Sequence, residues 1–185
     1  MFFAAYLLRM KFTVLSSTNR LGNLTAKVAL KYVENLNSKG FVVDYKDLTN
    51  VPSSALNDGM YRKAEHPLRD FGHDIFLSSD YFVIVIPEYN GSFPGILKLV
   101  VDACDPSIFK NKRFALAGVA SGRAGNLRGM DHFTAVLHYL QGEVYSVKQP
   151  FSQIKGLLNA NQDLIDENSL QMIDNQIRGF LNFIK

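Results

Sequence analysis

The chain has 185 residues, of which 47% are hydrophobic and 20% charged, and it carries a formal net charge of +3. This length is typical of one domain with a core of its own. The small charge and the lack of a long basic run argue against nucleic-acid binding. The single cysteine, Cys104, excludes an internal disulfide and favours a reducing cytoplasm.

The N-terminus begins with an apolar run, Phe2–Leu8, that is too short to span a bilayer. A secretory signal carries its positive charge before such a run, whereas here the arginine and the lysine follow it. We therefore expect an N-terminal tail at residues 1–9 and a folded domain at residues 10–185. Met10 is a candidate for the natural start.

Apolar runs and helical periodicities alternate along the rest of the chain. The apolar runs predict five strands, at residues 11–16, 41–47, 81–86, 113–120 and 143–147. The periodic segments predict five helices, at residues 23–37, 68–78, 96–104, 127–140 and 170–184. The motif Asn168-x-x-Gln171 resembles a capping box for the last helix. A surface loop is expected at residues 49–67 and an irregular flap over the sheet edge at residues 148–167.

Alternating strands and helices imply right-handed crossovers and a parallel sheet. Two doubly wound orders compete, 2-1-3-4-5 and the longer dinucleotide-binding order, and five strands favour the first. We predict an α/β fold with a doubly wound five-stranded parallel sheet, order 2-1-3-4-5, and helices on both faces. Strands one, three and four are neighbours in this order, so the loops after them converge on one site.

The loop after the third strand, residues 87–95, is the most informative stretch. Pro87 has no N–H group, so the strand is expected to end there. Ser92 is expected to cap the next helix, and Pro94 suits its first turn. Between them the loop carries a carboxylate, a phenol, a carboxamide and a glycine. Ligands bind at the carboxyl ends of strands in such sheets, which predicts a ligand here.

The loop after the first strand, residues 16–25, is rich in hydroxyls and carboxamides and opens a helix. A helix N-terminus offers free N–H groups, and Arg20 adds a fork for phosphate oxygens. The alternative is an ordinary helix cap with a solvated arginine. The loop has neither the Walker lysine nor the G-x-G-x-x-G pattern, so it is no P-loop or Rossmann fingerprint.

The loop after the fourth strand, residues 120–126, holds two glycines that let the backbone approach a ligand closely. The alternative is a flexible connection. Ser121 lacks the G-x-S-x-G context, and Asp131 and His132 follow in the wrong order for a triad of that fold. A serine hydrolase is therefore disfavoured, and the scattered histidines predict no metal site.

Together the three loops resemble those of the NADPH-dependent FMN reductase family, the flavodoxin-like quinone, azo and chromate reductases. Residues 87–98 match the most specific signature of that family almost throughout. Residues 17–25 are similar to its opening segment, and residues 121–125 fit its glycine-rich loop. The likeness extends from about Met10 to the C-terminus. One departure is Ser16, which stands where the family commonly has glycine.

The resemblance implies FMN as the cofactor, NADPH or NADH as co-substrate and a small-molecule electron acceptor. The residues implied to hold the FMN phosphate are Ser17, Thr18, Arg20 and Asn23. Those implied to border the isoalloxazine ring are Pro87, Glu88, Tyr89, Asn90 and Gly91. Those implied to flank its other side are Ser121, Gly122, Arg123 and Gly125. No catalytic side chain is required, because the flavin carries the redox chemistry.

The function expected is an FMN-dependent NAD(P)H oxidoreductase that passes a hydride through FMN to a quinone, an azo compound, a metal oxyanion or free flavin. One alternative is a flavin-binding electron carrier or sensor without nicotinamide turnover. Such carriers are usually strongly acidic for docking, whereas this chain is slightly basic. Another is a degenerate member that has lost flavin. We expect a cytoplasmic protein without membrane partner, and the resemblance implies a homodimer or homotetramer.

Overall fold

The computed structural model describes residues 10–53 and 66–185 of the chain. The N-terminal tail expected at residues 1–9 lies outside the described residues, and so does most of the loop expected at residues 49–67.

The centre of the fold is a parallel sheet with the strand order β2-β1-β3-β4-β5, in which a further strand, β6, also pairs with β4. The strands are β1 Lys11–Ser16, β2 Val42–Asp47, β3 Tyr81–Pro87, β4 Arg113–Val119, β5 Glu143–Val144 and β6 Gln149–Phe151. The predicted order is confirmed, and β3 ends at Pro87 as expected.

The fifth predicted strand is wrong in its extent, because the structure divides this region into two short strands. After β5 the chain leaves the sheet and returns as β6, which pairs with the last residues of β4. Between β5 and β6 the side-chain amide of Gln176 lies next to β4. Its Nε2 donates to Leu116 O at 2.9 Å and to Val147 O at 2.8 Å. Gln176 thus replaces ladder bonds of a continuous strand. The sheet has six strands, and residues 149–151 are not an irregular flap.

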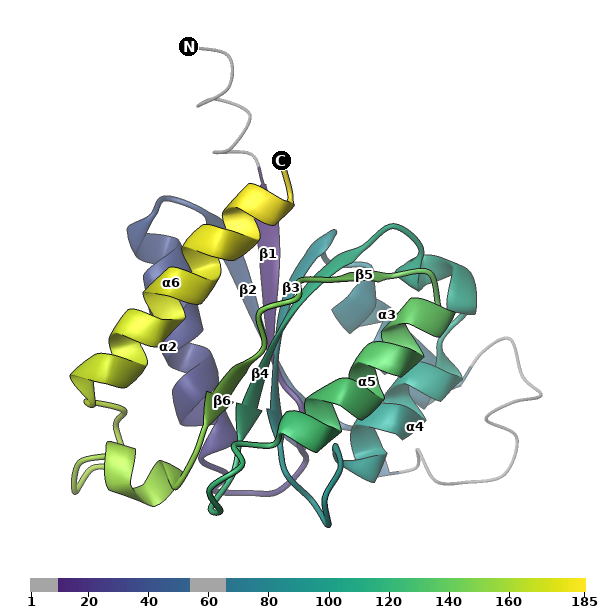
Figure 1. The fold of residues 1–185 in the computed structure, drawn as a ribbon. Helices are drawn as coiled ribbons and strands as arrows, with labels where there is room; N and C mark the ends of the chain where they lie inside the picture. Colours follow the sequence, from purple (N-terminus) through teal and green to yellow (C-terminus); the bar gives the residue numbers. More distant parts are fainter. Residues whose placement is uncertain (1–9, 54–65) are drawn as a thin grey trace.

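Helices cover both faces of the sheet (Figure 1). Two helices lie on one face, α2 Thr25–Ser38 and α6 Glu167–Phe183. Three lie on the other, α3 Pro67–Phe76, α4 Gly95–Ala103 and α5 Leu127–Tyr139. Short 3-10 helices occur at Leu48–Asn50, Pro106–Phe109 and Ile154–Leu157. The predicted doubly wound architecture is confirmed.

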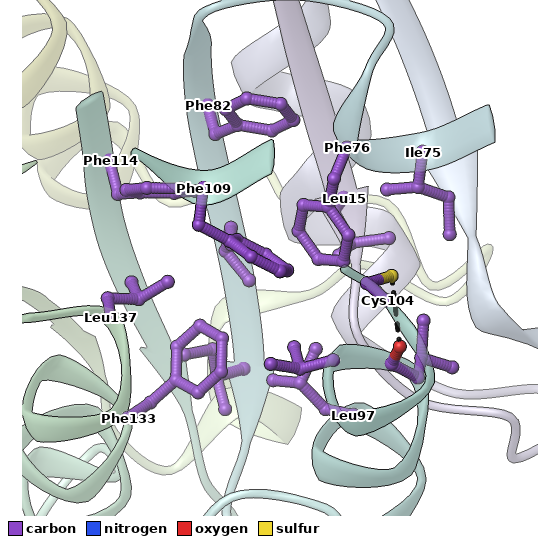
Figure 2. Close-up of a cluster of buried hydrophobic side chains, with 14 of the residues drawn as sticks. Leu15, Ile75, Phe76, Phe82, Leu97, Cys104, Phe109, Phe114, Phe133 and Leu137 are labelled. Atoms are coloured by element: carbon purple, nitrogen blue, oxygen red, sulfur yellow. Dashed lines mark hydrogen bonds between the residues drawn. The ribbon is translucent and has the colours of Figure 1, made fainter. Parts of the chain in front are cut away.

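Each face of the sheet buries its own hydrophobic core. Along β3, Phe82 and Ile84 pack into the α3–α4–α5 layer, and Val83 packs into the α2–α6 layer. A strand buried on both faces reads as a continuous apolar run, which is the pattern the sequence shows. Figure 2 shows aromatic side chains of the first core together with Cys104, which lies at one side of the cluster. The Cys104 thiol donates to Val100 O, and burial raises its pKa to about 12, so it behaves as a small hydrophobic residue.

Both predicted helix caps are wrong. Helix α4 begins at Gly95 with Pro94 as its cap, because Ser92 instead closes a tight turn by exchanging backbone hydrogen bonds with Tyr89. Helix α6 is capped by Asp166, which lies two residues before the expected Asn168. The side chain of Asp166 accepts hydrogen bonds from the amide and hydroxyl of Ser169, and these bonds lower the pKa of Asp166.

Candidate functional site

A cleft of about 370 Å³ opens at the carboxyl edge of the sheet, where β1, β3 and β4 end. Its lining comes from all three loops, as the strand order predicts, and from a fourth segment after β6. The lining residues are Arg20, Gly22, Asn23, Leu24, Thr25, Pro87, Glu88, Tyr89, Val119, Ala120, Ser121, Ile154, Lys155 and Gln162.

The first loop is tied to β3 and to the second loop by two hydroxyl groups. Ser17 and Thr18 are fully buried and lie outside the cleft lining. The Ser17 hydroxyl donates to Val85 O at 2.9 Å, and Thr18 Oγ1 lies 2.7 Å from Tyr89 Oη in a hydrogen bond. These contacts fix the first loop against its neighbours.

The start of α2 faces the cleft through Leu24 and Thr25. Asn23 Oδ1 accepts a hydrogen bond from the Ala26 amide at 2.8 Å, and its Nδ2 donates to Arg20 O at 2.8 Å. The Asn23 side chain therefore stabilises the turn before α2. The first turn contains no acidic residue. The positive end of the α2 dipole is therefore available to an anion.

Arg20 supplies positive charge to this wall of the cleft. Its side chain is exposed and has no ion pair among the described residues. The acidic residue in the lining is Glu88, and it too has no ion pair in the described part of the chain. An unpaired guanidinium beside a helix N-terminus is suited to phosphate oxygens.

The second loop begins where β3 pairs with the end of β4. Pro87 lies in register with Val119, whose carbonyl accepts a hydrogen bond from the Glu88 amide at 2.9 Å. The turn that follows places Asn90 at φ 51° and Gly91 at φ 78°. Both conformations are left-handed, which suits asparagine and glycine. Neither residue lines the cleft.

The third loop contributes Ser121 to the cleft, whereas Gly122 and Arg123 are exposed outside its lining. Gly125 is buried at φ 57°, and a Cβ atom there would lie 2.4 Å from Pro150 Cβ. Ser152 Oγ donates to Arg123 O at 2.7 Å. The third loop therefore rests directly on β6 and the residues after it.

The structure thus divides the predicted site residues into two groups. Those in the cleft lining are Arg20, Asn23, Pro87, Glu88, Tyr89 and Ser121. Those outside the lining are Ser17, Thr18, Asn90, Gly91, Gly122, Arg123 and Gly125.

The sequence patterns do not reveal the fourth wall of the cleft, which is formed by Ile154, Lys155 and Gln162. No motif marks these residues, and they lie in a segment that we expected to be irregular. These residues reach the cleft through the parallel pairing of β6 with β4, a tertiary contact that no sequence motif marks. This pairing brings the chain to the carboxyl edge just before Ile154.

The described residues contain no group of three or more His, Cys, Asp and Glu side chains arranged to hold a metal ion. His66 caps α3, as its Nδ1 accepts from the Leu68 amide at 3.2 Å. None of the helices that the structure describes combines the length and apolar character needed to cross a membrane.

A family model described as NADPH-dependent FMN reductase matches residues 10–153. The chain belongs to this family. Its cofactor is FMN, its co-substrate is a reduced nicotinamide nucleotide, and it is an oxidoreductase, as the resemblance of the three loops implied.

Curated relatives agree with the family. An NAD(P)H-dependent FMN reductase of Pseudomonas aeruginosa is 24% identical over 177 residues, covering 92% of this chain and 93% of the relative. A 2-hydroxy-1,4-benzoquinone reductase of a Burkholderia species is 33% identical over 98 residues, covering 49% of this chain and 52% of the relative. An FMN-dependent NADPH-azoreductase of Staphylococcus haemolyticus is 23% identical and covers 94% of this chain and 96% of the relative.

Solved structures support the fold. The flavoenzyme FerB, an NAD(P)H:acceptor oxidoreductase from Paracoccus denitrificans, aligns with a TM-score of 0.72 at 19% identity and covers 95% of this chain and 97% of its own. A short-chain flavodoxin aligns with a TM-score of 0.59 at 12% identity, covering 95% and 98%. These likenesses show the flavodoxin-like fold.

The donor set of the cleft fits FMN. Arg20 and the acid-free first turn of α2 offer cationic and N–H groups for a phosphate. The apolar side chains of Pro87, Val119 and Ala120 line the same cleft and are suited to contact a planar ring.

Proposed function

We propose that this protein binds FMN in the carboxyl-edge cleft and uses it to reduce small-molecule acceptors, quinones and azo compounds among them, with NAD(P)H as the reductant. The observation that carries the proposal is the convergence of three loops on one cleft beside the unpaired Arg20. The relatives named as quinone and azo reductases support this acceptor class. Metal oxyanions and free flavin are further acceptors.

In this proposal the first loop binds the phosphate. The Arg20 guanidinium donates to its oxygens, and the amides at the start of α2 add the favourable end of the helix dipole. Ser17 and Asn23 act chiefly by shaping the loop, because their side chains already bond to Val85 O and to the Ala26 amide. Thr18 faces Tyr89 across the junction of two loops and couples the phosphate and ring subsites.

The second and third loops bind the ring. FMN held between these two loops would supply the redox chemistry, that is, hydride transfer from the nicotinamide and reduction of the acceptor. Pro87, Glu88 and Tyr89 border the ring on one side, and Ser121 flanks it on the other. Asn90 and Gly91 form the left-handed turn of the second loop.

Gly122 and Arg123 leave the third loop exposed, where nicotinamide and acceptor enter in turn. Gly125 supports that loop by its close packing on Pro150. This arrangement gives ping-pong kinetics.

The competing function is a flavin-binding carrier or sensor without nicotinamide turnover. To separate the two, NADPH is added under argon to the purified protein loaded with FMN, and the visible flavin band is followed. Bleaching within seconds supports the reductase, whereas a persistent yellow colour indicates the carrier. Free FMN at the same concentration is the control. A protein that takes up no FMN would indicate a degenerate member of the family.

We also propose that the protein is cytoplasmic, as its single cysteine favours, and that it assembles as a homodimer or homotetramer, as the family resemblance implies. Size-exclusion chromatography with light scattering measures the assembly, and a monomer at micromolar concentration would contradict it.

A further inference from the structure

We propose that Lys155 is a second phosphate-binding cation of the cleft, which together with Arg20 binds a phosphomonoester dianion. The inference rests on the proposed function and adds a residue that lies outside the family match at residues 10–153. Lys155 lines the same cleft as Arg20 but comes from the segment after β6.

The distribution of unpaired cations points to this edge of the sheet. Most of the described lysines and arginines have an acidic partner within 4.0 Å. Among the described residues, the cations without such a partner are Arg20, Lys110, Arg123, Arg128 and Lys155. All of these except Lys110 lie at the carboxyl edge: Arg20 and Arg123 in loops, Arg128 in the first turn of α5 and Lys155 in the short 3-10 helix after β6. This edge therefore has unneutralised positive charge that attracts an anion.

The backbone before Lys155 is held firmly to the third loop. The Gln153 amide donates to Gly122 O at 2.9 Å, and the Ile154 amide donates to Ala120 O at 3.1 Å. The Ile154 side chain is buried in the core beneath. A lysine on such a fixed backbone loses less entropy on binding than one on a free loop.

The chain after Lys155 is held to the other side of the cleft. Lys27 in the first turn of α2 pairs with Asp163 at 3.4 Å, and Gln162 lines the cleft next to Asp163 in the chain. The segment therefore reaches from the third loop to the start of α2, where Arg20 and the helix N-terminus lie. Lys155 lies on this segment and adds its positive charge to that of Arg20 and the N-terminus of α2.

A phosphomonoester carries nearly two negative charges at neutral pH, so two cations neutralise it better than one. Two molecules in the proposed reaction carry such a group: FMN has a 5′-phosphate, and NADPH has a 2′-phosphate. Riboflavin and NADH are the matching compounds without it. Comparing each pair separates the two sources of the phosphate.

The experiment uses the wild type, Lys155→Ala, Lys155→Arg and the control Lys110→Ala. Lys110 is an equally unpaired cation that lies just before β4, at the opposite edge. Dissociation constants for FMN and riboflavin are measured by flavin fluorescence, and kcat/KM is measured for NADPH and NADH on the FMN-loaded enzymes. We expect Lys155→Ala to weaken binding of the phosphorylated member of one pair about tenfold, as for one charge-assisted hydrogen bond. Lys155→Arg keeps the positive charge and is expected to restore most of the lost binding, whereas Lys110→Ala stays within about twofold of the wild type.

The pattern of losses decides the inference. If Lys155→Ala loses affinity for FMN but not for riboflavin, Lys155 binds the flavin phosphate. If the variant loses kcat/KM for NADPH but not for NADH, Lys155 binds the phosphate of the nucleotide. Equal losses within each pair, or no loss at all, overturn the inference while the proposed function stands. A wild-type protein that does not bind FMN overturns both.

Discussion

The two edges of the sheet carry clefts of nearly the same size. The cleft at the amino edge, about 380 Å³, is lined by Met10, Lys11 and residues 77–81, and the cleft at the carboxyl edge measures about 370 Å³. At the amino edge Lys11 is paired with Asp44 at 2.7 Å, and the hydroxyls of Ser78 and Ser79 are bonded to Thr13. At the carboxyl edge Arg20 and Lys155 have no ion pair in the described part of the chain. Cations without an ion pair, rather than cleft volume, distinguish the carboxyl edge, where we propose that FMN binds.

The direction of the helices reinforces this difference. In a parallel α/β sheet each helix begins at the carboxyl end of the preceding strand, so the positive helix ends gather at that edge. Here α2 starts beside Arg20, and its first turn contains no acidic residue. The amino edge instead receives the helix C-termini. Phosphate is thus favoured at one edge and disfavoured at the other.

The largest effect on FMN affinity should come from removing Arg20, the cation of the first loop. Arg20→Ala is expected to weaken FMN binding by about 1.5–3 kcal/mol, because a charge-assisted hydrogen bond to phosphate is lost. Lys11→Ala, the matched change at the amino edge, should leave FMN affinity unchanged. Fluorescence titration with FMN measures both. Equal affinities of Arg20→Ala and the wild type would exclude the phosphate role given to Arg20.

A change in β4 tests whether the third loop must lie close to the sheet. An added Cβ atom at Gly118 would lie 2.1 Å from Gly125 O and 2.9 Å from Met130 Cε. Gly118→Ala should therefore displace the loop and lower the free energy of unfolding by about 1–3 kcal/mol, with weaker FMN binding.

Gly95→Ala is the control for Gly118→Ala, because a Cβ atom at Gly95 would meet nothing within 4 Å. It should leave stability unchanged or raise it by up to about 1 kcal/mol. Urea unfolding measures both variants, and equal stabilities would contradict the close approach.

The smallest effect concerns an ion-pair cluster away from the cleft. Asp174 on α6 accepts hydrogen bonds from Lys39 and Asn35, and these contacts lower its pKa to about 2. Asp174→Ala should cost about 1 kcal/mol of stability at pH 7 and leave FMN affinity unchanged. Since the folded pKa lies below the unfolded value of about 3.9, this contribution is lost as pH falls from about 4 to 2. Urea unfolding at pH 7 and pH 2 checks it, and an undiminished difference at pH 2 would contradict it.

Sequence patterns predicted the elements that depend on local hydrophobicity. The run at residues 81–86 is buried on both faces and forms β3, and the bounds of β1 are those predicted. The strand order followed from the count of strands and the crossover rule. These features are local or topological, so they are visible in one chain.

The features that the sequence did not predict depend on tertiary contacts. Gln176 on α6 interrupts the fifth strand through bonds to two distant carbonyls. Ser92 forms a turn with Tyr89 through two backbone hydrogen bonds, so the cap of α4 is Pro94 rather than Ser92. Lys155 reaches the cleft only because β6 pairs with β4. None of these contacts has a sequence motif.

The most direct test of the account is a crystal structure of the protein grown with FMN. We expect the flavin phosphate at Arg20 and the start of α2, with the ring between Pro87–Tyr89 and Ser121. Electron density for FMN at the amino edge, beside Lys11 and Tyr81, would contradict the account.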